Sequence, residues 1–384
     1  MSSIIGIDVS QKSSSFHLIE AGNKEGIDGS FPMTREGFES LLARTGCTNA
    51  PRFFMESTGR YHITLAHFLL QKGLQTFIVN PVLVKQFSKG HTLRKTKTDK
   101  VDARLIARFA ERGTGTKSNT RRTMDDQRLS IARRREQVAE EVAKTKTQLK
   151  ADLTVAFPEI LSRNVFTLGM LRFLNRFPCA ASICEATDEQ LLLALKGERG
   201  RGLSITVTQL RDLASGSIGL PTCGPLVADS AESLLFLNRK LDRLTDQLLC
   251  LVRQTQSEEM DIITSIHGIG DITAAHFLTE IGSIDRFERY QSLIAFCGTD
   301  PGIYQSGAIT KRGRITKRGN ASLRKYLYLM AMGLIRCNPY FKTYYDKKRE
   351  EGFPHRKAMV ALMNKLIKTL FAMLKKKEKF IVQS

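Results

Sequence analysis

The first 113 residues alternate between short apolar runs and segments with helical spacing. Five runs fit strands, at Ser3–Val9, Ser14–Ile19, Ile27–Phe31, Arg52–Glu56 and Thr76–Asn80. Three segments fit helices, at Arg35–Arg44, Tyr61–Lys72 and Asp99–Arg112. Three strands in a row, followed by alternating helices and strands, predict an α/β domain in which helices pack on a mixed sheet.

The middle of the chain contains two long helical patterns. Residues Asp125–Leu149 carry an apolar stripe, and residues 234–251 place leucines alternately three and four apart, as in a heptad seam. This seam fits either a helical core stripe or a coiled coil, and the two helices could pair with one another or across subunits. Between them, Thr154–Asp229 predicts a small helical insert with loops that contain Pro and Gly.

From about Asp261 the pattern is helical and basic. Residues His267–Gly270 have the form of a helix-hairpin-helix turn, in which Gly268 and Gly270 would let backbone N–H groups approach a DNA phosphate. A plain connection between two helices fits this short motif equally well.

The segment Ser306–Lys325 is strongly basic and contains no acid. Its interleaved glycines predict a loop-and-turn element that follows a nucleic-acid backbone, although a solvated basic face is the ordinary alternative. Its basic residues are Lys311, Arg312, Arg314, Lys317, Arg318, Arg324 and Lys325.

The chain of 384 residues has room for two domains and a connector. We expect an α/β domain over residues 1–120 and a helical connector, with the coiled coil and the insert at about 154–229, over residues 121–256. A mainly α-helical domain is expected over residues 257–384.

Charge narrows the choice of partner. The chain has 59 Lys and Arg against 38 Asp and Glu, a formal net charge of +21. Phosphate polymers are the usual partners of so basic a protein, with anionic membrane as the alternative. The apolar stretches are far shorter than a membrane-spanning helix, and the N-terminus lacks a secretory pattern. A cytoplasmic, nucleic-acid-binding protein that does not enter the membrane is therefore expected.

Four acids stand out by their placement. Asp8 and Glu56 each end an apolar strand, and the carboxyl edge of a sheet is where sites gather in such folds. Asp99 and Asp102 are three apart at the start of a predicted helix, so they point to the same side. Each acid alone could be a cap or a turn residue. Together, four carboxylates could hold Mg²⁺ or Mn²⁺, with two ions acting on a phosphodiester.

Basic residues surround the second pair of acids. Arg94, Lys95, Lys97 and Lys100 lie within a few positions of Asp99 in the sequence. An acidic cluster inside a basic region is expected where a metal must meet phosphate, so these four residues are candidate nucleic-acid contacts.

Several of these motifs resemble the insertion sequence 110 family of transposases, which includes Piv-type DNA invertases. The resemblance covers roughly residues 3–150 and 255–375. Its N-terminal motifs are Gly6–Ser10, Met55–Tyr61, Val79–Pro81 and Lys97–Ala103. Its C-terminal motifs are Ile266–Gly270, Ala295–Gly298, Pro301, Ser306 with Gly307, Gly313–Asn320, and Leu323 with Arg324.

The resemblance implies a fold, a set of site residues and a partner. The family's N-terminal domain has a RuvC-like, RNase-H-type fold, and its four metal-binding acids fall on Asp8, Glu56, Asp99 and Asp102. The family's nucleophilic serine falls on Ser306. Family members act with a structured non-coding RNA that pairs with donor and target DNA, so a guide RNA is an expected partner.

A serine hydroxyl must be activated before it attacks a phosphodiester. No base lies near Ser306 in the sequence, which favours activation at the carboxylate site and predicts a composite site built from both ends of the chain. Attack would leave a phosphoserine linkage and a free DNA hydroxyl, so strands could be rejoined without ATP. Tyr304 is the rival nucleophile, and Ser306 could instead be a hydroxyl that caps a turn.

Three other functions fit parts of the sequence. In a Holliday-junction resolvase the same carboxylates would activate water and Ser306 would take no part. An actin-like or sugar-kinase ATPase shares the Gly6–Ser10 pattern, but its further Gly-rich loops are not found between Val79 and Gly113. A non-catalytic DNA- or RNA-binding protein would not need all four acids. The leucine seam predicts a homo-oligomer, either a dimer or a tetramer.

Overall fold

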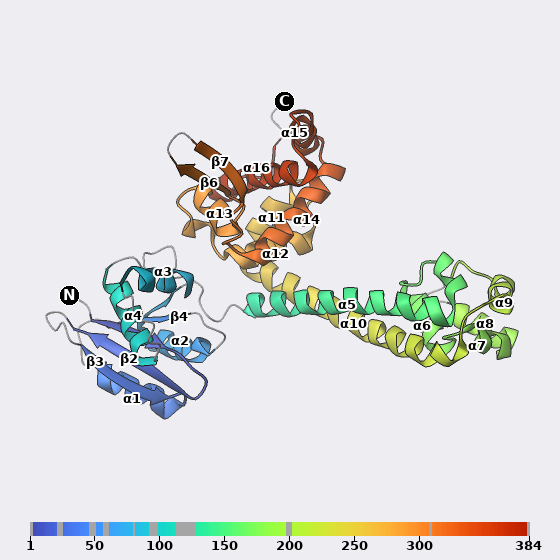
Figure 1. Cartoon of the computed structure of the whole chain (residues 1–384), viewed down its shortest axis with the longest axis horizontal. Coiled ribbons are helices and arrows are strands. Elements are labelled where there is room, and N and C mark those ends of the chain that lie inside the picture. The colour runs from blue at the N-terminus through green and yellow to red at the C-terminus, as the bar shows by residue number, and fades with distance from the viewer. Residues whose placement is uncertain are drawn as a thin grey trace. The chain divides into compact units, whose positions relative to one another are not determined.

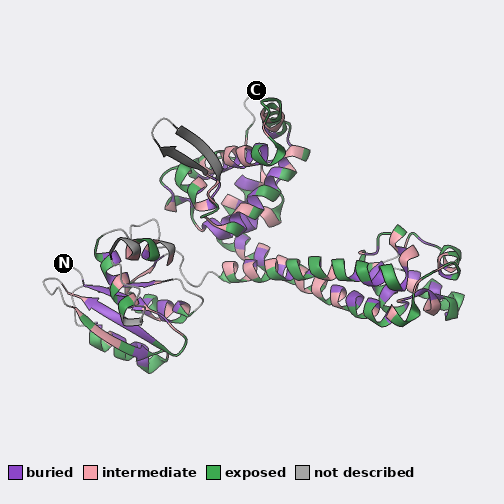
Figure 2. Cartoon of the chain, in the orientation of Figure 1, coloured by how far each residue is buried: buried purple, intermediate pink, exposed green. Residues whose placement is uncertain are grey.

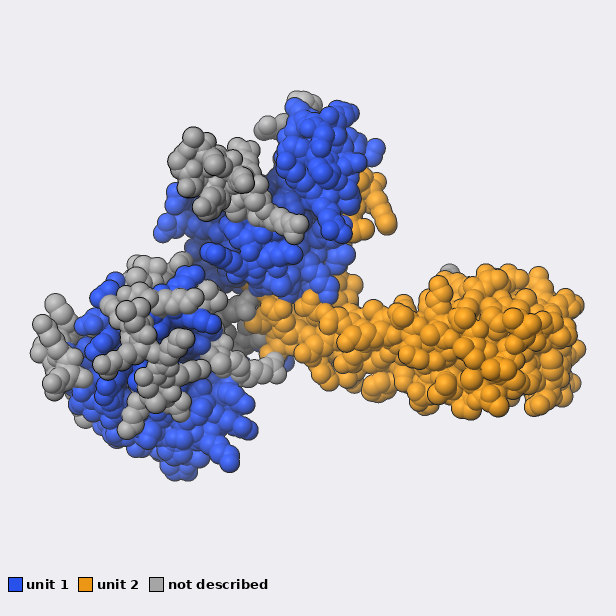
Figure 3. All heavy atoms as spheres, in the orientation of Figure 1, with its two compact units in different colours: residues 1–127, 281–331, 340–378 blue, residues 128–280, 332–339, 379–384 orange. Residues whose placement is uncertain are grey.

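The computed structural model describes residues 3–20, 26–45, 51–56, 61–79, 81–91, 99–112, 127–196, 202–306 and 309–381. Side chains are described within these ranges except at 82, 89–91, 99–100, 301–306 and 309–314. The chain divides into two compact units (Figure 3). The first comprises residues 1–127, 281–331 and 340–378, and the second comprises residues 128–280, 332–339 and 379–384.

The N-terminal region is built on a five-stranded mixed sheet with the strand order β3-β2-β1-β4-β5. β1 pairs antiparallel with β2, which pairs antiparallel with β3, whereas β1, β4 and β5 run parallel. The strands are β1 Ile4–Asp8, β2 Ser13–Ile19, β3 Ile27–Pro32, β4 Arg52–Glu56 and β5 Gln75–Val79. The five predicted strands and the mixed α/β sheet are confirmed, and this sheet agrees with the RNase-H-type fold that the resemblance implies.

Helices cover both faces of this sheet (Figure 1). They are α1 Arg35–Thr45, α2 His62–Gln71, α3 Pro81–His91 and α4 Asp99–Glu111. Ile5 and Ile7 belong to a core that includes residues of α1 and α2. Ile4 and Phe54 belong to a second core that includes residues of α3 and α4. The strand period of two therefore assigns alternate residues of β1 to opposite cores. β1, β2 and β4 are largely buried, whereas β3 and β5 are mostly half-buried or exposed (Figure 2). Helix α3 was not predicted from the sequence.

Helix α4 lies unusually close to β1. A Cβ atom at Gly6 would overlap the Ala103 carbonyl oxygen and would lie 2.8 Å from the Ala107 Cβ. Glycine and alanine at the contact thus allow the helix backbone to approach the strand backbone directly. In the C-terminal half of α4, Ile106, Ala107, Phe109 and Ala110 belong to the same core as Ile4 at the start of β1. Helix α4 therefore runs antiparallel to β1.

A polar contact joins α4 to β3, the strand at one edge of the sheet. The Arg104 Nε donates to Asp28 Oδ1 at 3.0 Å, and its Nη2 donates to Asp28 Oδ2. His17 Nδ1 lies 2.7 Å from the same Asp28 Oδ1. The hydrogen bonds from Arg104 lower the pKa of Asp28 to about 2, against the opposing effect of partial burial, and His17 adds to the lowering. We call these three residues the Arg104 clamp.

Two long antiparallel helices form the core of the second unit (Figure 1). They are α5 Gln127–Ala156 and α10 Gly224–Thr255. Arg128 near the start of α5 bonds to Thr255 at the end of α10, Arg135 bonds to Thr245, and the buried Asp152 accepts from Ser230 at 2.7 Å. The two helices that the sequence predicts thus pair with one another within the chain.

The leucine seam is unevenly buried. Leu234, Leu244 and Leu248 are buried, whereas Leu237 and Leu241 are only partly buried. Short helices at one end of the pair bury a core of their own together with both long helices. These helices are η2 Pro158–Ser162, α6 Leu168–Arg176, α7 Ala180–Glu185, α8 Asp188–Leu195, α9 Val207–Ser215 and η4 Pro221–Cys223. These short helices fall within residues 154–229, where the sequence predicts a helical insert.

The remaining elements are mainly helical, as predicted. They are α11 Ser257–Thr264, α12 Asp271–Ile281, η5 Ile284–Arg286, α13 Tyr290–Cys297, β6 Pro301–Ser306, β7 Ile309–Ile315, α14 Ala321–Cys337, α15 Pro339–Glu350 and α16 His355–Lys376. The loop-and-turn element expected from Ser306 onward is wrong over residues 309–315, because β7 pairs there with β6 in an antiparallel hairpin. Ile303 in β6 and Ile309, Thr310 and Ile315 in β7 are β-branched residues that favour strands, whereas the glycines in this segment favoured an assignment as turns. Within the described residues, no helix has the length and apolar character needed to cross a membrane.

We predict that Gly6→Val destabilises the protein by about 1–3 kcal/mol, the usual effect of forcing extra atoms into a packed contact. Chemical unfolding monitored by circular dichroism measures the change. Gly270→Ala is the control, since a Cβ at Gly270 meets no atom within 4 Å. Equal unfolding midpoints for Gly6→Val and the native chain would contradict the close approach of α4 to β1.

We also predict that Asp28 contributes stability that depends on pH. Its pKa is lowered from 3.8 to about 2, so the contribution of the ionised carboxylate is complete above pH 3.8 and is lost as the pH falls toward 2. Melting temperatures of the native chain and Asp28→Asn should differ most at pH 5 and converge as the pH approaches 2. A difference that stays constant over this range would count against the Arg104 clamp.

Candidate active site

Asp8 and Glu56 are the last residues of two neighbouring parallel strands. β1 and β4 remain paired as far as Ile7 with Met55, so Asp8 and Glu56 are the next pair in that register. Ile7 and Met55 are buried in the core beside α1 and α2, and the alternation of strand side chains turns Asp8 and Glu56 to the α4 face. Adjacent strands are about 4.8 Å apart, so the two acids are neighbours at the carboxyl edge of the sheet. Both are partly exposed.

The first turn of α4 lies near this edge. Asp99 begins the helix and is one turn before Ala103, which lies against Gly6. One helical turn covers about 5.4 Å, and two strand residues cover about 6.7 Å. Because α4 and β1 are antiparallel, the turn that begins at Asp99 is level with Asp8, two residues beyond Gly6.

Asp102 lies on the flank of α4 that is turned toward β4. It is one turn before Ile106, which belongs to the same core as Phe54 of β4. Phe54 precedes Glu56 by two residues on the same face of that strand. The fold therefore brings Asp8, Glu56 and the backbone positions of Asp99 and Asp102 to one side of the sheet.

The arrangement offers oxygen donors for a divalent cation. The side chains of Asp8, Glu56 and Asp102 are described, but that of Asp99 is not. Among the described side chains, no three His, Cys, Asp or Glu residues form a group that could hold a metal ion. Asp8, Glu56 and Asp102 thus do not form such a group by themselves, and the cluster of all four acids stays a prediction. The carboxylates on this face are nevertheless the donor type that Mg²⁺ and Mn²⁺ prefer.

The basic residues expected beside the acids fall mostly outside the described part of the chain. Arg94, Lys95 and Lys97 are not described. Lys100 is the second residue of α4, and its side chain is likewise not described. Their expected contact with nucleic acid stays a prediction.

Ser306 is at the tip of the β6–β7 hairpin. It is the last residue of β6 and pairs with Ile309, the first residue of β7. The two connecting residues, 307 and 308, lie outside the described part. The side chain of Ser306 is not described, so its expected role as a nucleophile stays a prediction.

The predicted basic segment divides into three structural settings. Lys311, Arg312 and Arg314 belong to β7. Lys317 and Arg318 are exposed in the loop between β7 and α14, where Lys317 has a φ of 54°. This left-handed conformation is uncommon for a residue with a side chain. Lys325 is exposed on α14.

Arg324 differs from its basic neighbours. Its Nη1 donates to the Cys297 carbonyl at 3.0 Å and to the Gly319 carbonyl at 3.3 Å. It thereby connects the end of α13 with the loop before α14. The position that the sequence suggested as a nucleic-acid contact thus has a structural role in holding this loop.

The glycines of the helix-hairpin-helix-like turn also differ in setting. Gly268 has a φ of 103°, and a Cβ there would lie 2.9 Å from the Gly333 carbonyl oxygen of α14. The neighbouring His267 carbonyl accepts from Asn338 Nδ2 at 3.2 Å. Gly268 is therefore required by local conformation and packing. Gly270 immediately precedes α12 and has open space beside its Cα.

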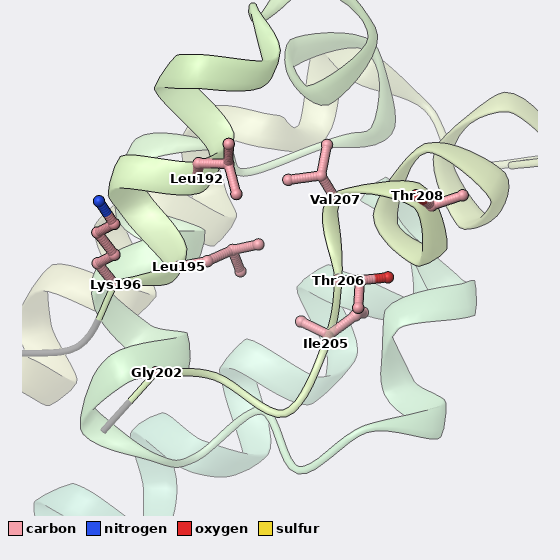
Figure 4. Close-up of a pocket in the computed structure, with 8 residues that line it drawn as sticks. All are labelled: Leu192, Leu195, Lys196, Gly202, Ile205, Thr206, Val207 and Thr208. Atoms are coloured by element: carbon pink, nitrogen blue, oxygen red, sulfur yellow. The ribbon is translucent and has the colours of Figure 1, made fainter. Parts of the chain in front are cut away.

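A groove in the second unit is chemically unlike the carboxylate site. It has a volume of about 740 Å³ and lies between the end of α8 and the start of α9 (Figure 4). Its lining includes Leu192, Leu195, Ile205 and Val207, with Lys196 as its charged side chain. The described part of its lining offers no carboxylate, histidine or thiol as a metal donor or general base, so we do not treat it as a candidate active site.

The Arg104 clamp was missed by the sequence analysis. Asp28 and Arg104 are 76 residues apart, and neither lies in a recognisable motif. The available signal was an Arg two positions after Asp102, which alone does not identify its partner.

Comparisons with known proteins match both the N-terminal and the C-terminal part of the chain to transposases. A family model described as "Transposase", for the DEDD proteins of the IS110 type, matches residues 5–158. A second model, "Transposase IS116/IS110/IS902 family", matches residues 260–346.

Three relatives share most of the chain. The insertion element IS110 uncharacterized 43.6 kDa protein of Streptomyces coelicolor is 24% identical over 97% of this chain and 93% of its own length. The pilin gene-inverting protein of Moraxella bovis is 22% identical over 98% and 97%, respectively. The mini-circle putative transposase for IS117 of Streptomyces coelicolor is 25% identical over 83% and 81%. With both family models matched in order, the chain belongs to the insertion sequence 110 family of transposases.

Proposed function

We propose that this transposase cuts and rejoins DNA with a divalent-metal site at Asp8, Glu56, Asp99 and Asp102 and with Ser306 as nucleophile. One observation supports this most strongly: two carboxylates end adjacent parallel strands on the face over which α4, the helix that begins with the other two acids, is packed. The pilin gene-inverting protein, by its name, inverts a DNA segment. DNA is therefore the proposed substrate.

The carboxylates would hold Mg²⁺ or Mn²⁺, and two ions would fit the number of donors. Bound there, divalent cations would stabilise the negative charge that develops on the reacting phosphate. The sheet fixes the positions of Asp8 and Glu56, whereas the positions of Asp99 and Asp102 depend on how α4 packs on the sheet. The protein's own contribution is thus to keep like charges close enough to share a cation.

Ser306 would supply the hydroxyl that attacks the DNA phosphate. An Oγ–P bond forms, one P–O bond of the DNA backbone breaks, and the departing DNA oxygen takes up a proton as the serine hydroxyl releases one. The phosphoserine linkage keeps the phosphodiester energy, so attack by a DNA hydroxyl reverses the step and joins strands. The placement of Ser306 at a hairpin tip favours this role.

The proposal also includes partners. A structured non-coding RNA would choose donor and target DNA by base pairing, and the net charge of +21 provides for such polyanions. Exchange between two duplexes requires more than one active site, which suits a dimer or tetramer. Basic loop residues such as Lys317 and Arg318 would contact the nucleic-acid backbone.

The resolvase alternative keeps the carboxylates and removes the serine from the chemistry. Water would then attack the phosphate, and the cut strands would end without a protein attachment. Trapping a protein–DNA adduct distinguishes the two reactions directly.

Ser306→Ala is expected to abolish both the covalent adduct and strand exchange on supercoiled donor DNA supplied with its RNA and Mg²⁺. Denaturing gel electrophoresis of labelled DNA detects the adduct. Tyr304→Phe is the matched control on the same strand and should retain it. Adduct formation by Ser306→Ala but not by Tyr304→Phe would assign the nucleophile to Tyr304. Cleavage without an adduct in the native chain would favour the resolvase.

Lys317→Gln combined with Arg318→Gln should weaken duplex DNA binding without a loss of melting temperature. Each phosphate contact contributes about 0.9 to the slope of log affinity against log salt, so the slope should fall by about two. Arg324→Gln is the contrasting variant, because loss of its bonds to the Cys297 and Gly319 carbonyls should lower the melting temperature. An unchanged salt slope in the double variant would show that the loop with Lys317 and Arg318 does not contact the DNA backbone.

A further inference from the structure

Helix α4 has two flanks with different partners. Ala103 and Ala107 face β1 at Gly6. Arg104 and Asp102 are two residues apart, about 200° around the helix axis, so they lie on opposite flanks. Arg104 reaches Asp28 on β3, whereas the flank of Asp102 faces β4, where Glu56 ends the strand.

The contact on the Arg104 flank is directional. The guanidinium binds both oxygens of Asp28, and His17 binds one of them as well. His17 is buried, with 4% of its side chain exposed, and the side chain of Asp28 is 21% exposed. The acceptor is therefore fixed within the sheet rather than carried on a mobile surface side chain. A bidentate Arg–carboxylate pair constrains orientation as well as distance.

The other contacts of α4 constrain it less completely. The glycine and alanine contact at β1 sets how closely the helix approaches the strand, and it presents no large side chain that would prevent rolling. The apolar contacts of Ile106 and Phe109 occupy the β4 flank in the second core. Packing of this kind is non-directional. The Arg104 clamp supplies the opposing, oriented contact.

We infer that Arg104 and Asp28 are positioning residues for the metal site. By fixing the roll of α4 from the β3 side, they hold Asp102 and the start of the helix over Asp8 and Glu56 on the other side. The inference rests on the proposed function, because it assigns the clamp to the same carboxylate site. Neither residue would touch the cation or the DNA.

The direction in which the Mn²⁺ affinity changes distinguishes a positioning role of Arg104 from a simple effect of its charge. Removing a cationic side chain near an acidic site strengthens the attraction for a metal ion. Arg104→Gln should therefore bind Mn²⁺ more tightly if only charge matters. If the clamp positions α4, the same substitution weakens binding, since loss of a supporting contact to a metal site typically lowers affinity about 10- to 100-fold.

The experiment titrates the full-length protein with Mn²⁺ alone and follows the free ion by electron paramagnetic resonance. We expect Arg104→Gln and Asp28→Asn each to weaken binding about tenfold or more. Arg104→Lys keeps the positive charge but cannot form the two parallel hydrogen bonds of a guanidinium, so its Mn²⁺ affinity should be intermediate. Arg108→Gln is the matched control, because Arg108 is exposed one turn further along the same helix, and it should bind as the native chain does.

A reciprocal exchange, Asp28→Arg with Arg104→Asp, supplies a second variant that can restore the pair across the same gap. Recovery of Mn²⁺ affinity relative to either single change supports positioning. Equal or tighter binding by Arg104→Gln overturns the inference, as does a loss of the same size in Arg108→Gln. Failure of the proposed function has a different signature: Asp8→Asn would then bind Mn²⁺ as tightly as the native chain does.

Discussion

The direct backbone contact between β1 and α4 is the constraint on which the candidate site depends. Gly6 leaves no side chain between the strand and the alanines of the helix, so the helix backbone packs directly against the strand backbone. Its first turn, with Asp99 and Asp102, then falls level with the strand ends that carry Asp8 and Glu56. A larger side chain at Gly6 would lift the helix and separate acids that are far apart in the sequence.

Much of the N-terminal fold could be predicted because its signals are local. The alternation that places Ile5 and Ile7 in one core and Ile4 in the other is visible as a short apolar strand. The leucine seam over residues 234–251 likewise indicates a helix, and Leu234, Leu244 and Leu248 are its buried members. The hairpin that carries Ser306 was missed because glycines within β6 and β7 favoured an assignment as turns.

The candidate site could be predicted in part, for a different reason. Strand ends identify Asp8 and Glu56 without knowledge of tertiary structure, but local spacing does not reveal that Asp28 binds Arg104 across 76 residues. Nor does a basic run show which members serve the fold. Arg324 binds backbone carbonyls, whereas Lys317 in the same run is exposed. Such distinctions depend on contacts that are distant in sequence.

The central claim is that acids from two strands and one helix share a cation site. Anomalous diffraction from crystals of the full-length protein grown with Mn²⁺ tests it most directly. The account predicts manganese peaks between Asp8, Glu56 and the first turn of α4, with carboxylate oxygens about 2.2 Å from the ion, as hard divalent cations require. Manganese bound elsewhere, with these side chains turned away from one another, would contradict it.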